Sequence, residues 1–502
     1  MSANESHAAV VNSGRPRAGR THWDAVVCGG GTAGPAVAAR LAEAGRQVLL
    51  VEAGPDYGPF SRGKWPVELT KAATIATTHD WGYVSGDELP GRDLPYERAK
   101  VIGGCSAHNG CTVSWGHSSD YDNWGQPGWS GDELLASFEV ANADMRVRYF
   151  EEDEVLPLHD GFITSALKRG HARVDDLDTL NGVAGVGLQP SNAPDGVRWH
   201  AGFAYLDRVR HLTNITVAAD SLIDRVIMSG TRAVGITAID GEGRFDVYAD
   251  LVVLTCGAYG TPAVLHRSGV GPAQDLRALG IEVIADNPGV GKNLHDHPSV
   301  KLVYSGTDLL VRETKHFAAM GHYMADEQAF LKLASSRCRD DAFDLHIYPA
   351  PGPERLPEIY INAVDPRSRG QLRLASADPA AAPLIDHGFL TDPEGHDHTV
   401  LADGVAISRD IASESAMAAL LGTEIRFGPD ADIAQAIYDN IIHYWHPVGS
   451  CAMGIACDAQ GKVFGVENLV VGDASLFPQT PRATTGIPVV AAALRISDFL
   501  LD

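Results

Sequence analysis

The 502-residue sequence lacks the features of a membrane-spanning or disulfide-bonded protein. It has no run of about 18 consecutive apolar residues, so we expect no transmembrane helix. Its seven cysteines are few and odd in number, and no two of them form a Cys-x-x-Cys pair. This pattern argues against a disulfide framework or a structural zinc site, and we expect a cytoplasmic protein without a bound metal.

Positive charge is also scarce, because 40 lysines and arginines stand against 64 aspartates and glutamates, for a net charge of −24. Without a basic face the protein is not expected to bind nucleic acid or an anionic membrane surface. The negative charge has two interpretations: solubility alone, or attraction of a cationic substrate. Hydrophobic residues make up 45% and charged residues 21%, which is typical of a folded globular protein.

The beginning of the chain differs from the rest. Residues 1–22 are polar and contain no apolar core of a secretory signal, so we expect a disordered extension. The remaining length is enough for two or three domains. Order is predicted to begin near Trp23.

A βαβ unit follows at once. Residues 24–28 form a short apolar run that ends at glycines, as in a buried parallel strand. Residues 36–44 place small and apolar side chains at helical spacing, and 48–51 read as a second buried strand. The spacing therefore predicts a nucleotide-binding βαβ unit.

Later segments predict two interleaved domains. Residues 54–127 are glycine-rich and irregular, as in loops around a ligand, and strands are predicted at 215–218, 225–228, 251–257 and 469–471. The sequence pattern changes after about residue 299. Alternating apolar and polar residues predict strands at 358–361 and 371–374, and helical spacing predicts helices at 398–422 and 431–442. This combination suggests an antiparallel sheet flanked by helices. We expect a first domain from 23–160, 200–298 and 441–502, and a second from 161–199 and 299–440.

The glycines after the first strand fit the pattern G-x-G-x-x-G. Gly29 permits a tight turn, Gly31 lets the backbone approach a diphosphate, and Gly34 allows close packing of helix and strand. The helix N-terminus then faces the diphosphate, and Glu52, which ends the second strand, accepts ribose hydroxyls. These residues predict dinucleotide binding but do not choose between FAD and NAD.

Further motifs resemble one family. Several segments resemble, in the same order along the chain, the signatures of the glucose–methanol–choline (GMC) flavin oxidoreductases. They are 101–110 and 120–124, then 257–262 with 268–272, 288–298, 446–454 and 472–475. The resemblance implies FAD and a mixed α/β and α+β architecture, in which a Rossmann-like FAD-binding domain carries an inserted substrate domain built on an antiparallel sheet. It disfavours a nicotinamide enzyme.

The form Gly103-Gly104-Cys105-Ser106-Ala107-His108-Asn109 looks like the choline oxidase type. The resemblance implies that His108 is a candidate for a covalent bond to the flavin, with the alternative that it only packs on the ring. A covalent bond would raise the flavin potential. Gly110 stands where that type has a serine, so one polar contact is missing.

The resemblance also implies a set of cofactor-binding residues beyond the glycines and Glu52. They are Thr32, Ala33, Ala53, Val101, Gly104, His108, Asn109, Gly110, Cys111, Thr112, Val226, Trp445, Asp473, Ala474, Thr485 and Ile487.

Oxidation of an alcohol requires a base for the hydroxyl proton, and histidine suits that role near neutral pH. Among 20 histidines, His446 stands in a Tyr-Trp-His-Pro run that matches the family's catalytic histidine, while His443 is interpreted as structural. Family members usually carry a second histidine or asparagine that holds the substrate oxygen. That position falls on Thr484, which can donate a hydrogen bond but cannot act as the base.

Three residues are candidates for substrate contact. Glu327 lies roughly where choline-type members place the carboxylate that pairs with a trimethylammonium group, with a solvated surface residue as the alternative. His346 and Tyr348 are candidates for lining the same cavity.

We therefore expect an FAD-dependent oxidase or dehydrogenase of a small-molecule alcohol, with dioxygen or another acceptor reoxidising the flavin. The charge and Glu327 favour an amine-bearing alcohol, and a sugar-like alcohol is the alternative. Other hypotheses are a biosynthetic dehydrogenase with a different acceptor and a flavin-binding protein without catalysis. A non-redox lyase or decarboxylase is a further hypothesis, because Thr484 replaces the usual histidine or asparagine.

Overall fold

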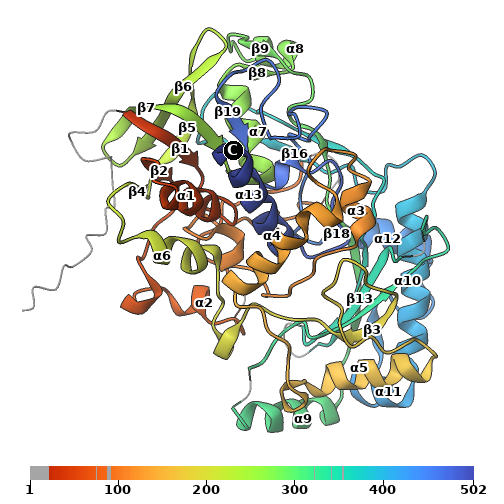
Figure 1. The fold of residues 1–502 in the computed structure, drawn as a ribbon. Helices are drawn as coiled ribbons and strands as arrows, with labels where there is room; N and C mark the ends of the chain where they lie inside the picture. Colours follow the sequence, from red (N-terminus) through yellow and green to blue (C-terminus); the bar gives the residue numbers. More distant parts are fainter. Residues whose placement is uncertain (1–21, 75, 87–91, 322, 341, 353–355) are drawn as a thin grey trace, which may run out of the picture.

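The computed structural model describes residues 22–74, 76–86, 92–321, 323–340, 342–352 and 356–502. The extension expected over residues 1–22 lies outside these ranges except for His22, which opens the first strand. Figure 1 shows two layered regions, one around α1 and α13 and the other around α5, α10 and α11.

The first region is built on a seven-stranded sheet. Its order is β4-β2-β1-β7-β6-β5, and β19 pairs with the end of β7. The pairs β4–β2, β2–β1, β1–β7 and β7–β19 are parallel, whereas β5, β6 and β7 form an antiparallel arm. The strands are β1 (His22–Cys28), β2 (Val48–Val51), β4 (Ile215–Ala218), β5 (Leu222–Ser229), β6 (Arg232–Asp240), β7 (Gly243–Leu254) and β19 (Leu469–Val471).

The parallel part of this sheet is covered on both faces, which explains its continuous apolar runs. Val26 and Val27 of β1 and Leu49 of β2 are completely buried in one core with the alanines of α1. The helices of this region are α1 (Gly34–Glu43), α4 (Gly131–Asp144), α7 (Gly257–Arg267) and α13 (Gly486–Leu501). The chain end thus returns to pack on α1, near the first strand.

The second region contains another seven-stranded sheet, which is antiparallel throughout. Its order is β17-β11-β14-β13-β12-β3, and β18 pairs with β11. The strands are β3 (Gly185–Leu188), β11 (Pro298–Tyr304), β12 (Ala329–Leu333), β13 (Leu345–Ala350), β14 (Glu358–Ala363), β17 (Glu424–Arg426) and β18 (Ile442–His443).

The two faces of the second sheet differ in chemistry. One face carries Val300, Leu302, Ile361 and other aliphatic residues and packs against α5 and α10. Since successive residues of a strand point to opposite faces, the other face carries the alternate residues. Strand pairing aligns Ser299, Asn362, His346 and Lys332 in one row across four strands, all of them buried.

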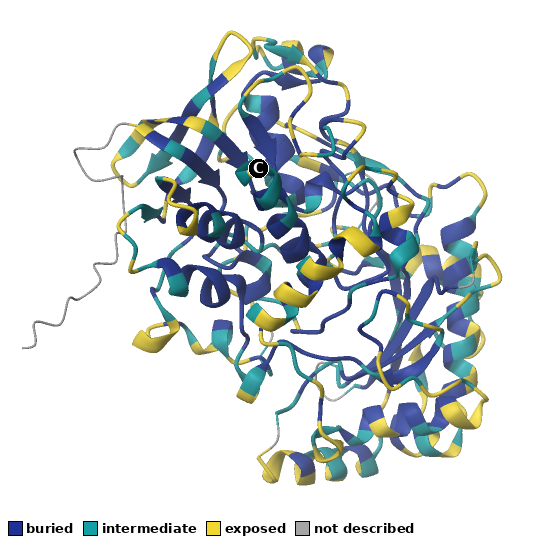
Figure 2. Ribbon diagram, viewed as in Figure 1, coloured by how far each residue is buried: buried dark blue, intermediate teal, exposed yellow. Residues whose placement is uncertain are grey.

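The helices of this region are α5 (Pro157–Lys168), α9 (Asp308–Ala319), α10 (His396–Ala412), α11 (Ser415–Leu421) and α12 (Ile433–Asn440). Figure 2 shows that α9 and α11 carry exposed residues on the rim while the strands are buried. The helix predicted over 398–422 is two helices, because Glu414 adopts an extended conformation between α10 and α11.

Two small sheets complete the strands. The strands are β8 (Val270–Gly271) with β9 (Ala285–Asp286), and β10 (Lys292–Leu294), β15 (Gly370–Arg373) and β16 (Leu384–Asp386). The strand predicted at 371–374 therefore belongs to a separate three-stranded sheet. In the described part of the loop-rich segment 54–127, the regular structure is limited to short helices and isolated β-bridges, in keeping with its glycine content.

Short helices fill the connections. The α-helical turns are α2 (Val67–Thr70), α3 (Ser118–Asp122), α6 (Asp207–Val209) and α8 (Ala273–Ala278), and the 3₁₀ and π turns are η1 (Phe60–Arg62), η2 (Gly104–Ala107), η3 (Glu152–Glu154), η4 (Pro194–Gly196), η5 (Gly202–Leu206) and η7 (Ala474–Leu476). Within the described ranges no helix is long and apolar enough to cross a membrane. Sheet membership supports the interleaved domain division, whose boundaries remain a prediction.

Candidate active site

The glycine loop joins β1 to α1 in a tight turn. Gly29 has φ +106°, and its N–H donates to Val51 O at 2.8 Å. A Cβ atom on Gly34 would lie 1.9 Å from Gly29 O, so only glycine fits there. A Cβ on Gly31 would meet nothing closer than Gly104 Cα, at 3.9 Å. The loop therefore leaves room above Gly31, as the close approach of a diphosphate requires.

Glu52 lies at the end of β2 beside this loop. Its Oε2 accepts a hydrogen bond from Gly30 N at 2.7 Å and its Oε1 one from Gly54 N at 2.8 Å. Burial raises its pKa to about 7, although both backbone bonds act in the opposite direction. Each carboxylate oxygen keeps further lone-pair capacity for a ribose hydroxyl.

The segment 101–112 packs directly on the glycine loop. A Cβ on Gly104 would lie 2.6 Å from Gly31 Cα, so the two backbones touch. Buried Arg198 fixes the segment by donating to the carbonyl oxygens of Asn109 at 2.8 Å and Ala107 at 3.3 Å. The structure thus joins two motifs that the sequence separates.

His108 follows η2 within this segment and is partly buried. Its Nε2 atom is buried and has no hydrogen-bond partner among the described residues. Burial and the charge of Arg198 lower its pKa, so the imidazole is neutral. A buried nitrogen without a partner fits a ring that faces a bound group.

His446 stands in a cluster of buried polar groups. Its Nδ1 lies 3.0 Å from Nδ1 of His297, and its main-chain N–H donates to both carboxylate oxygens of Asp296 at 3.0 Å. The N–H of His297 donates to Oδ1 of the same carboxylate at 2.7 Å. Burial, and then the neighbouring His297, lower the pKa of His446 well below its ordinary value.

Asp296, His297 and His446 are also near enough for a metal ion, with ligand atoms within 4.8 Å of one another. Their atoms are already used in hydrogen bonds to one another and to main-chain N–H groups. We therefore interpret the group as a hydrogen-bonded cluster. Asp296, His297 and Thr480, which lies against His297, were missed as site residues, although the segment 288–298 was recognised.

Thr484 lies at the start of α13, where Thr485 is the N-cap residue. Its hydroxyl donates to Thr112 O at 2.9 Å. The single hydrogen of this hydroxyl is therefore directed at the backbone in this structure. Thr484 connects the helix to the segment that carries His108.

Glu327 lies next to the same segment. A Cβ on Gly110 would come within 3.8 Å of its Oε1. Burial raises the pKa of Glu327 to about 7, whereas the neighbouring hydroxyls of Thr112 and Tyr348 lower it. The position is thus partly buried and distinct from a solvated surface.

Aromatic rings surround this carboxyl group. Tyr348 stacks on Tyr360 with ring centroids 5.1 Å apart, on Phe330 at 4.7 Å and on Tyr444 at 5.9 Å. The stack reaches His446, whose ring is 4.3 Å from that of Tyr444. It connects the candidate base to Glu327.

His346 belongs to the neighbouring row of the same sheet face. It is 1% exposed, and neither ring nitrogen has a hydrogen-bond partner within the part of the chain that the structure describes. Burial lowers its pKa well below the ordinary value. Its nearest ring neighbour is Phe343, at 5.4 Å.

The remaining predicted residues have mainly structural contacts. Buried Asp473 accepts hydrogen bonds from Gly257 N at 2.8 Å and Thr261 Oγ1 at 2.6 Å, and so ties β19 to α7. Val226 lies in the antiparallel arm, where its N–H donates to Ser268 Oγ at 2.8 Å. Trp445 is 41% exposed and donates to Glu97 Oε2 at 2.9 Å.

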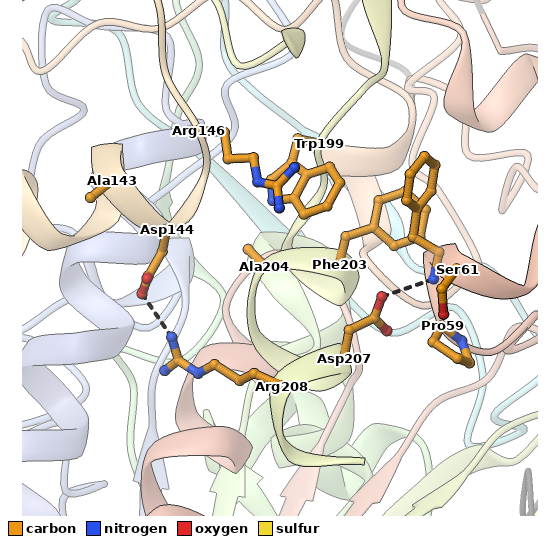
Figure 3. A pocket seen from close by; sticks show the side chains of 11 residues that line it. Pro59, Ser61, Ala143, Asp144, Arg146, Trp199, Phe203, Ala204, Asp207 and Arg208 are labelled. Carbon is orange, nitrogen blue, oxygen red and sulfur yellow. Dashed lines mark hydrogen bonds and ion pairs between the residues drawn. The ribbon is translucent and has the colours of Figure 1, made fainter. Parts of the chain in front are cut away.

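A surface hollow of about 490 Å³ lies away from these groups, near the end of α4 and η5 (Figure 3). The guanidinium of Arg146 stacks over Trp199 at 3.6 Å from the ring centroid. Asp144 and Arg208 form an ion pair across its edge. None of the predicted site residues lines it.

A glycine-loop nucleotide fold, joined to a sheet whose polar face reaches the His297–His446 pair, indicates a dinucleotide-dependent oxidoreductase. Residues 23–299 and 366–493 match the N- and C-terminal models described as GMC oxidoreductase, and the chain belongs to this family. GMC oxidoreductases bind FAD, and the protein is an FAD-dependent oxidoreductase that acts on alcohols.

The chain is similar to choline oxidase from Arthrobacter globiformis, with 30% identity covering 95% of this chain and 94% of the relative. It is 29% identical to an oxygen-dependent choline dehydrogenase from Burkholderia thailandensis, covering 95% and 93%. Among solved structures, pyridoxine 4-oxidase from Mesorbium loti superposes with a TM-score of 0.83 at 25% identity, covering 95% and 98%.

Proposed function

We propose that His446 is the base that accepts the hydroxyl proton of the alcohol. The observation that carries this assignment is its Nδ1 contact with His297, since this holds the ring while Nε2 makes no hydrogen bond among the described residues. The lowered pKa keeps the imidazole neutral, as a base must be.

The test is His446→Ala and His446→Gln, compared with His316→Gln on the exposed side of α9. Loss of a general base lowers kcat by roughly 10²–10⁴. We expect this loss with FAD still bound, measured by the flavin absorbance, and no loss in the control. Near-normal turnover of both His446 variants would exclude the assignment.

FAD, when bound, accepts the hydride that leaves the substrate carbon. The proposed cradle consists of the glycine loop, Glu52, the segment 101–112 and the residues around Asp473. Its support is the room above Gly31 and the unused acceptor capacity of Glu52. Thr484 is assigned to holding Thr112 in place, which leaves its contact with a substrate oxygen as a prediction.

We propose a covalent bond between His108 and the flavin. The buried, unpartnered Nε2 and the neutral ring support it, because a neutral imidazole nitrogen has the free lone pair that bond formation needs. Acid precipitation of the holoprotein tests it: yellow colour stays with the pellet if the bond exists. Colour in the supernatant of wild type would contradict the bond.

The proposed substrate is an amine-bearing alcohol, of the class that includes choline. A carboxylate next to stacked tyrosines suits an ammonium group, since ring faces and a negative charge both attract cations. His346 and Tyr348 are proposed to line this site, because both lie on the polar face of the sheet and the Tyr348 hydroxyl lowers the pKa of the carboxyl group.

Choline and its neutral analogue, with carbon in place of the charged nitrogen, test this class. We expect kcat/KM to favour the cation in wild type and to lose this preference in Glu327→Gln, while exposed Glu282→Gln keeps it. Equal preference in wild type and Glu327→Gln would exclude Glu327 from recognition.

The acceptor that reoxidises the flavin is proposed to be dioxygen. Peroxide formation during turnover would identify an oxidase, whereas turnover only with an added dye would identify a dehydrogenase.

The seven cysteines carry no disulfide, as is typical of a reducing compartment, which supports the proposed cytoplasmic location.

A further inference from the structure

The hydrogen bonds of His446 continue beyond His297. The Nε2 atom of His297 lies 3.1 Å from Thr480 Oγ1, and this hydroxyl lies 3.4 Å from Pro481 O. A chain of contacts thus runs from the candidate base through a second imidazole and a hydroxyl to a main-chain carbonyl. All the residues beyond His446 in this chain are buried.

Only two proton arrangements satisfy such a chain. In one, His446 Nδ1–H donates to His297, His297 Nε2–H donates to Thr480, and Thr480 O–H donates to Pro481 O. In the reverse arrangement every hydrogen points the other way, and His446 carries its hydrogen on Nε2. In the first arrangement Nε2 of His446 carries no hydrogen and can accept a proton. In the reverse arrangement Nε2 already carries a hydrogen and cannot accept one.

The acceptors at the far end favour the first arrangement. A carbonyl oxygen cannot donate, so Pro481 O receives the Thr480 hydrogen only in the first arrangement. Pro481 O also accepts from Ala483 N at 2.7 Å and keeps a second lone pair for this hydrogen. His297 therefore offers a bare Nδ1 to His446.

Thr480 itself is held from a second side. Its main-chain N–H donates to His295 Nε2 at 3.0 Å, while His295 Nδ1 contacts Asn293 O at 2.7 Å. Two residues on, Arg482 N donates to Asp120 Oδ2 at 2.9 Å. These bonds fix the main chain on both sides of Pro481.

We propose that Thr480 and His297 are positioning residues that fix the tautomer of His446, so that its Nε2 is free of hydrogen and accepts the alcohol proton. In that step the substrate O–H bond breaks and an Nε2–H bond forms on His446; FAD, when bound, would take up the hydride from the substrate carbon. The Nδ1 hydrogen is then shared between the two imidazoles. The inference rests on the proposed role of His446.

The resulting positive charge has a counter-ion in place. The Asp296 carboxylate bonds to the main chain of both histidines. Burial alone would raise its pKa, but His443 and the surrounding imidazoles keep it below the ordinary value, so it is ionised. Further charged or titratable groups that interact with the pair are Arg98, His443, His346, Asp365 and His295.

The direct test is the nitrogen NMR spectrum of ¹⁵N-histidine-labelled holoenzyme without substrate. His446→Gln and His297→Gln assign the resonances. We expect a non-protonated Nε2 and a protonated Nδ1 for His446 in wild type. A protonated Nε2 in wild type would overturn the proposal, whatever the activity of the enzyme.

Thr480→Val removes the hydroxyl at nearly constant volume, and Thr480→Ser restores it. Loss of one such hydrogen bond changes a tautomer ratio by a factor of roughly 3–10. We expect flavin reduction by choline, or by whichever alcohol the panel shows to reduce the flavin, to slow by that factor in Thr480→Val and to recover in Thr480→Ser.

Comparing the His446 variants with Thr480→Val also separates this inference from the base assignment. If the His446 variants are inactive and Thr480→Val matches wild type in rate and in the ¹⁵N spectrum, the tautomer relay is wrong and the base assignment survives. If the His446 variants are active, the base assignment itself fails.

Discussion

The two large sheets contain the same number of strands but distribute polar residues differently. The parallel strands of the first sheet are apolar on both faces, and their functional groups lie only in the loops at the strand ends, as with Gly29 and Glu52. In the second sheet, one face is apolar and the other places His346, Tyr348 and Lys332 within the strands themselves. The first sheet therefore positions the loops of the proposed cofactor site, whereas side chains of the second sheet themselves line the proposed substrate site.

The glycine loop provides the largest expected effect in this comparison. Gly34→Ala places a Cβ 1.9 Å from Gly29 O, so we expect no folded flavoprotein. Gly31→Ala brings its Cβ no closer than 3.9 Å to any other atom and should fold, but lose affinity for FAD. Far-UV circular dichroism and flavin absorbance distinguish the outcomes. A folded, yellow Gly34→Ala protein would contradict the packing argument.

Arg482 links the two regions through carboxylates from each. It pairs with buried Asp120 at 2.9 Å and with Asp340 at 2.6 Å. Removing one partner of a buried pair costs roughly 3–5 kcal/mol. We expect Arg482→Met to lower the free energy of unfolding by about that amount, measured by urea denaturation.

Arg339→Met is the matched control, since its pair with Asp365 is more exposed. Exposed pairs contribute only about 0–1 kcal/mol. Equal losses in the two variants would show that burial does not separate these pairs.

Neighbouring residues of β14 test the two faces of the second sheet. Ile361 is completely buried against the helices, whereas Tyr360 faces the aromatic stack. Ile361→Ala should cost roughly 2–5 kcal/mol through lost burial and a cavity. It should leave the KM of an amine-bearing alcohol little changed. Tyr360→Leu removes the ring face but keeps an apolar side chain, so it should raise this KM. Thermal unfolding and steady-state kinetics measure the two effects.

The smallest expected effect is a pH dependence at Glu327. Its pKa is raised to about 7 by burial, so the carboxyl group is neutral below that pH and charged above it. We expect the KM of a cationic alcohol to fall about tenfold per pH unit as the pH approaches 7 from below. The neutral analogue and Glu327→Gln should show no such trend. A flat profile for the cation would contradict the assignment.

Sequence patterns predicted the features that depend on near neighbours. The βαβ unit and the roles of Gly29 and Gly34 follow from spacing, because they involve consecutive residues. His446 was recognised from a motif match, and its chemical role remains a prediction.

The surroundings of His446 could not be predicted, because they depend on pairing between distant segments. Pro298 pairs with His443, which brings Asp296 and His297 beside His446. Nothing in local periodicity indicates this register. For the same reason periodicity indicates an antiparallel strand at 371–374 but not that it pairs in a separate three-stranded sheet.

The contact between Gly31 and Gly104 has an evolutionary consequence. Since the Cβ of any larger residue at 104 would strike the backbone at 31, packing alone requires glycine at position 104. Divergent descendants of this gene should keep Gly104, or replace it only together with a shift of one loop.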